Sequence, residues 1–119
     1  MATELRLSDL HPVQRQLVEL ISVIEFGRIE NLLVQDGLPR FAPPPRIIRE
    51  FKLEREEQAA ARAASRGDYL LKTQARRLLG QLMALGDGRV EMIAIAHGLP
   101  HRMSIESTGR PVLTGAFGP

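Results

Sequence analysis

Near the start of the chain, the spacing of apolar residues predicts an amphipathic helix. Apolar residues recur every three or four positions, the spacing of one helix face: Val13, Leu17, Leu20, Ile21 and Ile24. Pro12 stands at the first helical position, where its missing N–H leaves no hydrogen bond unmade. Gly27 follows the stripe and is a typical helix terminator. The pattern therefore predicts a helix that begins at Pro12 and ends before Gly27.

A second apolar stripe predicts a helix that begins at Asp68 and runs to about Leu85. Asp68 is a suitable N-cap, and Gly86 stops the helix. The stripe consists of Leu71, Ala75, Leu78, Leu82 and Leu85. Between the two stripes, residues 54–66 are rich in Glu, Arg and Ala, which predicts a polar helix with little to bury.

Each apolar helix is followed by a predicted β-hairpin. Asp36-Gly37 and His97-Gly98 separate apolar runs, and both pairs suit a two-residue turn, which requires positive φ. After the stiff triple proline at 43–45, residues 47–53 are predicted as a further strand, with Ile47, Phe51 and Leu53 on one face. The tail 108–119 is rich in Gly and Pro and is predicted to be flexible.

The two hairpins resemble each other at an offset of 61 residues. Gly-Arg-Ile-Glu at 27–30 matches Gly-Arg-Val-Glu at 88–91, and Gly-Leu-Pro at 37–39 matches Gly-Leu-Pro at 98–100. The match suggests an internal duplication, although helix–glycine–hairpin is also a common local solution that arises by chance. We therefore predict one two-layer α+β domain over residues 1–107. Its two helix–hairpin units span about 9–53 and 68–107, joined by the polar helix 54–66.

Apolar residues occupy both odd and even positions of the predicted strands. If side chains alternate between the two faces without interruption, both faces of the sheets are apolar. Pairing across His97-Gly98 places Val90 opposite Ile105 and Ile93 opposite Arg102. A sheet that is apolar on both faces must be covered on both, and the two helices can cover one. The predicted partner interface consists of Leu32, Val34, Phe41, Ile93 and Ile95. We expect a homodimer or a protein partner there.

Composition limits the class of protein. The chain has 119 residues, no cysteine and 4% aromatic residues, so its core is built from aliphatic side chains and it has no disulfides. No apolar run approaches the roughly 18 residues that a membrane helix needs, and the N-terminus lacks the order of a signal peptide. We expect a cytoplasmic protein with no membrane partner.

Basic residues concentrate in the middle of the chain. Residues 40–77 contain ten basic and five acidic side chains, a balance of +5, whereas the whole chain carries +2. The arginines that could bind backbone phosphates of a nucleic acid are Arg46, Arg49, Arg62, Arg66, Arg76 and Arg77. Nucleic-acid binding is therefore the alternative function. The interspersed glutamates and the scarcity of aromatic residues favour a solvated charged surface instead.

No catalytic constellation emerges from the sequence. His97 and His101 straddle a turn and lack a third ligand, so we predict no metal site. Glu30 and Glu91 each follow an arginine by two residues, which favours Arg–Glu pairs over a carboxylate pair for acid–base work. We predict no cofactor and no enzymatic activity.

The segments Gly-Arg-Ile-Glu-Asn-Leu at 27–32 and Pro-Pro-Pro-Arg-Ile-Ile-Arg-Glu at 43–50 resemble a set of short, uncharacterised bacterial proteins. These share the order of helix, hairpin and Pro-Pro-Pro-Arg strand, and the resemblance covers the first half of the chain. It implies a recurring module and no activity. The leading hypothesis is a non-enzymatic protein-interaction or regulatory module that self-associates.

Overall fold

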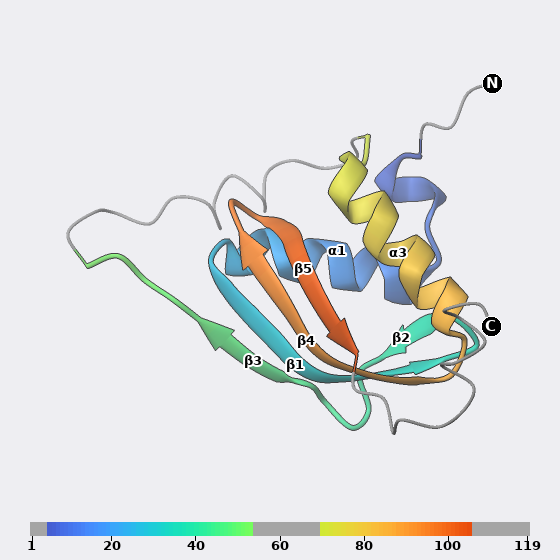
Figure 1. Ribbon diagram of the computed structural model, residues 1–119. Coiled ribbons are helices and arrows are strands. Elements are labelled where there is room, and N and C mark those ends of the chain that lie inside the picture. Colours follow the sequence, from blue (N-terminus) through green and yellow to red (C-terminus); the bar gives the residue numbers. More distant parts are fainter. Residues whose placement is uncertain (1–4, 54–69, 106–119) are drawn as a thin grey trace, which may run out of the picture.

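The computed structural model describes residues 5–53 and 70–105 of the chain. In these residues two α-helices pack against an antiparallel five-stranded sheet, which confirms the α+β class (Figure 1). In chain order the elements are a 3₁₀ turn η1 (Leu7–Asp9), α1 (Pro12–Ile24), β1 (Gly27–Gln35), β2 (Leu38–Arg40), β3 (Arg46–Arg49), α3 (Thr73–Leu85), β4 (Gly88–Ala96) and β5 (Leu99–Ile105). The predicted helix 54–66 and tail 108–119 lie outside the described residues.

The sheet has one continuous edge and one divided edge. Its order is β2-β1-β4-β5, and β3 also pairs with β1. β2 pairs with the end of β1 at Leu33–Gln35, whereas β3 pairs with its beginning at Gly27–Glu30. β2 and β3 therefore share one side of β1, and β5 alone forms the opposite edge of the sheet.

α1 begins at the predicted proline. His11 is the N-cap: its Nδ1 accepts a hydrogen bond from the backbone N–H of Val13 at 3.3 Å. The backbone N–H of His11 in turn donates to Oε1 of Gln14 at 3.0 Å, which completes a capping box. The helix ends at Ile24, as the sequence predicts within a residue or two.

α3 begins later than predicted, so the start at Asp68 is wrong. The helix runs from Thr73, with Lys72 as its N-cap. Just before it, the backbone N–H of Leu71 donates to the carbonyl oxygen of Leu5 at 2.8 Å, and Leu70 forms a β-bridge with Arg6. These contacts hold the chain extended and delay the first helical turn. No helix in the described part of the chain is long and apolar enough to cross a bilayer.

The two units superpose along the sequence without a gap. α1 and α3 each contain 13 residues, and their first residues, Pro12 and Thr73, are 61 positions apart. β1 and β4 each contain 9 residues and begin at Gly27 and Gly88, again 61 apart. Both turns have the predicted positive φ, with 55° at Asp36 and 56° at the equivalent His97. Whether the units arose by duplication stays a prediction.

The central strand pair relates the units by an approximate twofold. Gly27 pairs with Ile95, and its counterpart Gly88 pairs with Val34, the counterpart of Ile95. The midpoint of the register therefore lies between equivalent positions of β1 and β4, close to Glu30 opposite Met92. One sheet and one core thus unite the two units.

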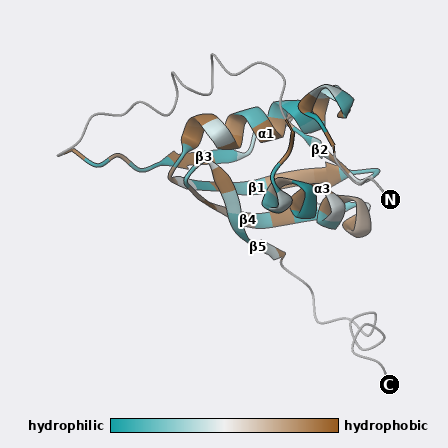
Figure 2. Cartoon of the chain, turned by 90° about the horizontal axis from the view of Figure 1, so that it is seen from above, coloured by the Kyte–Doolittle hydropathy of each residue, from teal (hydrophilic) through white to brown (hydrophobic). Residues whose placement is uncertain are grey.

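The core lies between the helices and one face of this sheet. Buried aliphatic residues from both units form a single cluster, to which α1 contributes Leu17, Val18, Ile21 and Ile24, and α3 contributes Ala75, Leu78, Leu79 and Leu82. In Figure 2 the helices and the strands of the sheet both carry brown apolar stretches. The sheet positions that complete this core include the residues predicted to bind a partner.

Candidate docking groove

The predicted partner interface is wrong, because its residues belong to the protein's own core. Leu32, Val34 and Ile93 are fully buried, and Ile95 is 5% exposed. Phe41 is half-buried and packs against the same cluster. The four buried side chains are not available to a partner while the domain is folded, and Phe41 is engaged with the same core.

Irregular strands explain the error. Asn31 has a φ of +61°, and the buried positions of β1 run Ile29, Leu32, Val34 instead of alternating throughout. β4 is shifted against β5 between Val90 and Met92, so that Val90, Ile93 and Ile95 all face the helices. A β-bulge reverses the facing of every later residue in its strand, and simple alternation misses this.

The same shifts change the predicted pairing of the second hairpin. Val90 lies opposite Ile105, as predicted, but Ile93 lies opposite Met103 rather than Arg102. A second shift between Ala94 and Ile95 restores the predicted register next to the turn.

The outer face of the sheet is polar enough to face water, which removes the argument for a second covering layer. Nε of Arg28 lies 2.8 Å from Oε2 of Glu30, as the predicted Arg–Glu pair requires. The guanidinium of Arg46 lies 3.8 Å from the other oxygen of Glu30. Among the described strands, two large apolar side chains are exposed by 40% or more: Ile47 and Ile105. Each pairs with a residue that faces the helices, so neither lies on the outer face.

The structure does not gather the predicted arginines into one patch. Arg46 and Arg49 lie on β3, whereas Arg76 and Arg77 lie on α3, at opposite sides of the molecule (Figures 1 and 2). Arg62 and Arg66 are outside the described residues. Nη2 of Arg49 donates to the carbonyl oxygen of Val23 at 3.3 Å. The four predicted phosphate-binding arginines that the structure describes therefore form two separate pairs. Nucleic-acid binding stays a prediction.

The two histidines singled out by the sequence lie apart from the two glutamates, which share one hollow. His97 is in the β4–β5 turn, with its ring 5.0 Å from the Phe26 ring in an edge-to-face contact. His101 is exposed on β5. Glu30 and Glu91 both line an open hollow on the outer face of the sheet. Within the described ranges, no three His, Asp or Glu residues are grouped so as to hold a metal ion.

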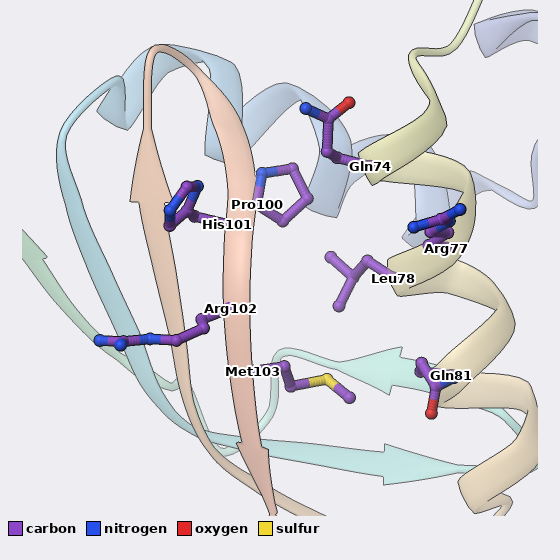
Figure 3. A pocket seen from close by; sticks show the side chains of 8 residues that line it. All are labelled: Gln74, Arg77, Leu78, Gln81, Pro100, His101, Arg102 and Met103. Atoms are coloured by element: carbon purple, nitrogen blue, oxygen red, sulfur yellow. The ribbon is translucent and has the colours of Figure 1, made fainter.

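A groove lies between α3 and the continuous edge of the sheet (Figure 3). It is lined from the helix by Gln74, Arg77, Leu78 and Gln81, and from β5 by Pro100, His101, Arg102 and Met103. Its volume is about 200 Å³, which suits one bulky side chain better than a drug-sized ligand. Figure 3 shows Leu78, Pro100 and Met103 between helix and strand, where they form an apolar floor.

The charged residues that line this groove are all basic. Arg77 stands on the helix side, and His101 and Arg102 point away from the helix on the strand side (Figure 3). All three side chains are exposed, and none of the residues lining the groove is acidic. The groove therefore has an apolar floor, and its charged lining residues are the two arginines Arg77 and Arg102.

β5 borders the groove with an edge that no described strand pairs. β4 lies on the side of β5 away from α3, so the free edge of β5 turns toward the helix (Figure 3). Pro100 has no backbone N–H to donate, and His101 is the extra residue of a β-bulge, because Ile95 pairs with Pro100 and Ala94 pairs with Arg102. The regular part of this edge is therefore Arg102–Ile105. An extended segment in the groove would lie within reach of those backbone groups.

Sequence reasoning missed the groove, but the repeat contains a signal for it. In the first unit the equivalent helix positions are Val13, Gln16, Leu17 and Leu20. There Phe41, which follows β2, and Leu20 pack against the core. The second unit has Gln81 in place of Leu20 and Arg102 in place of Phe41. Because His101 is an extra residue in β5, Arg102 points away from the helix and Met103 packs against the core, as Phe41 does in the first unit. The difference between the units on this side is therefore the polar Gln81 in place of the apolar Leu20.

No protein-family model, no curated protein and no solved structure matches this chain.

Proposed function

We propose that the protein is a non-enzymatic protein-interaction module, acting in the cytoplasm, that docks a segment of a partner in the α3–β5 groove. The observation that supports this proposal is the apolar floor of Leu78, Pro100 and Met103 beside the edge of β5 that no described strand pairs. An apolar side chain can be buried on that floor while its backbone approaches the edge of β5. Peptide segments meet both requirements at once.

The charge around the groove selects the kind of segment. Arg77 on the helix side and Arg102 on the strand side are its charged lining residues, and none of the lining side chains is acidic. Opposite charge at the rim speeds association and excludes cationic competitors. The expected ligand is an extended, acidic segment with one large apolar residue.

Selection from a library of displayed peptides tests this function on the full chain. We expect the selected peptides to combine acidic residues with a Phe, Leu or Met, and to bind in the micromolar range. Arg77→Glu should weaken their binding by about tenfold, because it replaces attraction by repulsion at the rim.

Arg89→Glu is the matched control. It makes the same charge change at an exposed arginine of β4 that does not line the groove, so peptide affinity should stay within about twofold. If no peptide is enriched, or if both variants weaken binding equally, the groove is not the docking site.

A further inference from the structure

The strand that borders the groove is also the last described strand of the chain. β5 ends at Ile105, and residues 106–119 follow it in the sequence. Ile105 pairs with Val90, which is fully buried against the helices, yet Ile105 itself is 40% exposed. No described strand pairs with the far edge of β5. An antiparallel strand that came next in the chain would reach this edge after a short turn.

We propose that residues 110–114 return along the free edge of β5 and occupy the α3–β5 groove in competition with a partner segment. This inference rests on the proposed docking function of the groove. The occupant is a segment of the same chain, so the groove is covered when no partner is present. A partner segment binds once this return strand has been displaced, and the return strand thereby regulates docking.

The sequence after β5 supports a hairpin with a three-residue loop. Ser107-Thr108-Gly109 suits such a loop, because its last position requires positive φ and glycine adopts that conformation without strain. This loop places Glu106 opposite Arg110, an oppositely charged cross-strand pair. The return is complete at residue 114, so the sequence is long enough to run beside Arg102–Ile105.

The same loop determines which side chains of the return strand face the groove. Directly opposite residues of an antiparallel pair lie on the same face of the sheet. Leu113 comes opposite Met103, which lines the groove with Leu78 and packs against the core. Pro111 comes opposite Ile105 and would cover its exposed side chain, and proline is tolerated on an outermost strand. Leu113 thus supplies the large apolar side chain that suits the floor of the groove.

Tethering, rather than charge, supplies the affinity of the return strand. Residues 106–119 contain one acidic and one basic residue, Glu106 and Arg110, whereas the expected partner segment is acidic. A short flexible connection gives an effective concentration of about 1 mM. With a Kd of about 0.1 mM for the detached segment, the attached segment lowers the affinity for a partner by about tenfold. An acidic partner segment can therefore displace it.

Disulfide trapping in the full chain tests the return strand. The chain has no cysteine, so a double cysteine variant can form a single disulfide within one molecule. Ser104→Cys with Val112→Cys places thiols at directly opposite positions, and Ser104 lines the outer hollow rather than the groove. In oxidised glutathione, we expect this variant to form its intramolecular disulfide at least about tenfold faster than a control pair. Non-reducing electrophoresis and mass spectrometry measure the rates.

Glu91→Cys with Val112→Cys is the matched control. Glu91 lines the same hollow as Ser104 but lies on β4, one strand further from the free edge. A freely moving tail reaches both positions, whereas a return strand holds residue 112 beside β5 and about 10 Å from β4. Equal rates for the two pairs overturn the return strand. Disulfide-linked dimers in place of cross-linked monomers assign the segment to a second copy, which overturns it as well.

Peptide affinity tests the competition. With a peptide selected from the displayed library as the probe, Leu113→Ser in the full chain should raise the affinity by about tenfold, because it weakens the competing segment. Val112→Ser is the matched control: it changes the neighbouring apolar residue, which comes opposite Ser104 on the outer face, and affinity should stay within about twofold. Equal effects of the two substitutions overturn the competition.

The outcomes separate this inference from the docking function. If library peptides bind the wild-type and Leu113→Ser chains alike, and the two cysteine pairs react at equal rates, the return strand is overturned and the docking function stands. If the pair at 104 and 112 reacts selectively but neither chain enriches a peptide, the docking function fails and the competition fails with it.

Discussion

The backbone N–H of Gly37 donates to the carbonyl oxygen of Gly86 at 2.7 Å. The pseudo-equivalent bond runs from Gly98 to Glu25 at 3.0 Å. The hairpin turn of each unit therefore binds the end of the other unit's helix, where carbonyl groups lack intrahelical partners. Next to the first bond, the N–H of Asp36 also donates to Oδ1 of Asp87 at 2.9 Å. The two units are joined by these exchanged contacts as well as by the shared core.

Hydrogen exchange should detect the exchanged bonds. The closing bond of a two-residue turn uses the amide of the residue after Gly37 or Gly98, so these two glycine amides are otherwise free to exchange. We expect both to be protected to nearly the same degree as the core strands, because releasing them separates the units. NMR-detected exchange measures this. Rapid exchange at both glycines would contradict the interlocked arrangement.

Gly86→Ala should destabilise the protein. Gly86 has φ +75° and ψ −84°, and the next N–H, that of Asp87, bonds back to the carbonyl of Leu85 in a tight γ-turn. Nothing lies within 4 Å of an added Cβ, so the effect comes from the backbone alone, and we expect a loss of about 1–2 kcal/mol in unfolding free energy. Urea denaturation measures it.

Gly80→Ala is the control for that measurement. Gly80 lies within α3, is exposed, and also has open space around an added Cβ. There the same substitution should stabilise the protein by about 0.5–1 kcal/mol, because alanine favours the helix. Equal signs for the two substitutions would contradict the backbone explanation.

Gly27→Ala should disrupt the pairing of β3 with β1. Gly27 has a φ of +148°, and an added Cβ would collide with the carbonyl oxygen of Ile48. We expect a loss of about 2–4 kcal/mol in unfolding free energy. At the pseudo-equivalent Gly88, an added Cβ meets the flexible end of Leu85 at 3.2 Å, so Gly88→Ala should change stability far less. Thermal and chemical denaturation of the two variants provide the comparison.

Ile93→Ala should affect folding rather than association. Ile93 is fully buried under the helices, and its truncation should lower the unfolding free energy by about 2–5 kcal/mol. If Ile93 instead formed a partner interface, the variant would keep its stability and lose only self-association. Denaturation and sedimentation of the same sample distinguish these results.

The arginine alternative has its own test. Arg46 lies 3.8 Å from Glu30, and Arg49 bonds to the carbonyl of Val23, so both β3 arginines are already engaged. We expect fluorescence anisotropy at about 50 mM salt to show no binding to a DNA duplex or to single-stranded RNA. Salt-dependent binding that Arg46→Ala with Arg49→Ala weakens would restore nucleic-acid recognition.

Local chemistry explains which parts of the fold could be predicted. The turns at Asp36 and His97 depend on the conformational preferences of two adjacent residues, and both have the expected positive φ. The facing of β1 depends on an irregularity at Asn31, a residue type that tolerates positive φ but does not by itself mark a break in alternation within an apolar run. Simple alternation therefore assigns Leu32 and Ile93 to an interface, although they belong to the core. The start of α3 depends on a tertiary hydrogen bond between Leu71 and Leu5.

The groove was beyond prediction for a related reason. Its helix-side residue Leu78 and its strand-side residue Met103 are brought together by packing rather than by nearness in sequence. Comparing the two units by position aligns Arg102 with Phe41, but the extra residue at His101 shifts the strand, so that Met103 packs against the core instead.

The divided edge of the sheet limits how far this fold can aggregate. On that side, β2 has three residues and β3 has four, separated by a proline-containing stretch that cannot continue a ladder. A second molecule that pairs with β5 therefore meets no matching continuous strand on the far side of the sheet. Strand addition stops after one step, and the molecule is protected from growing edge to edge into a fibre.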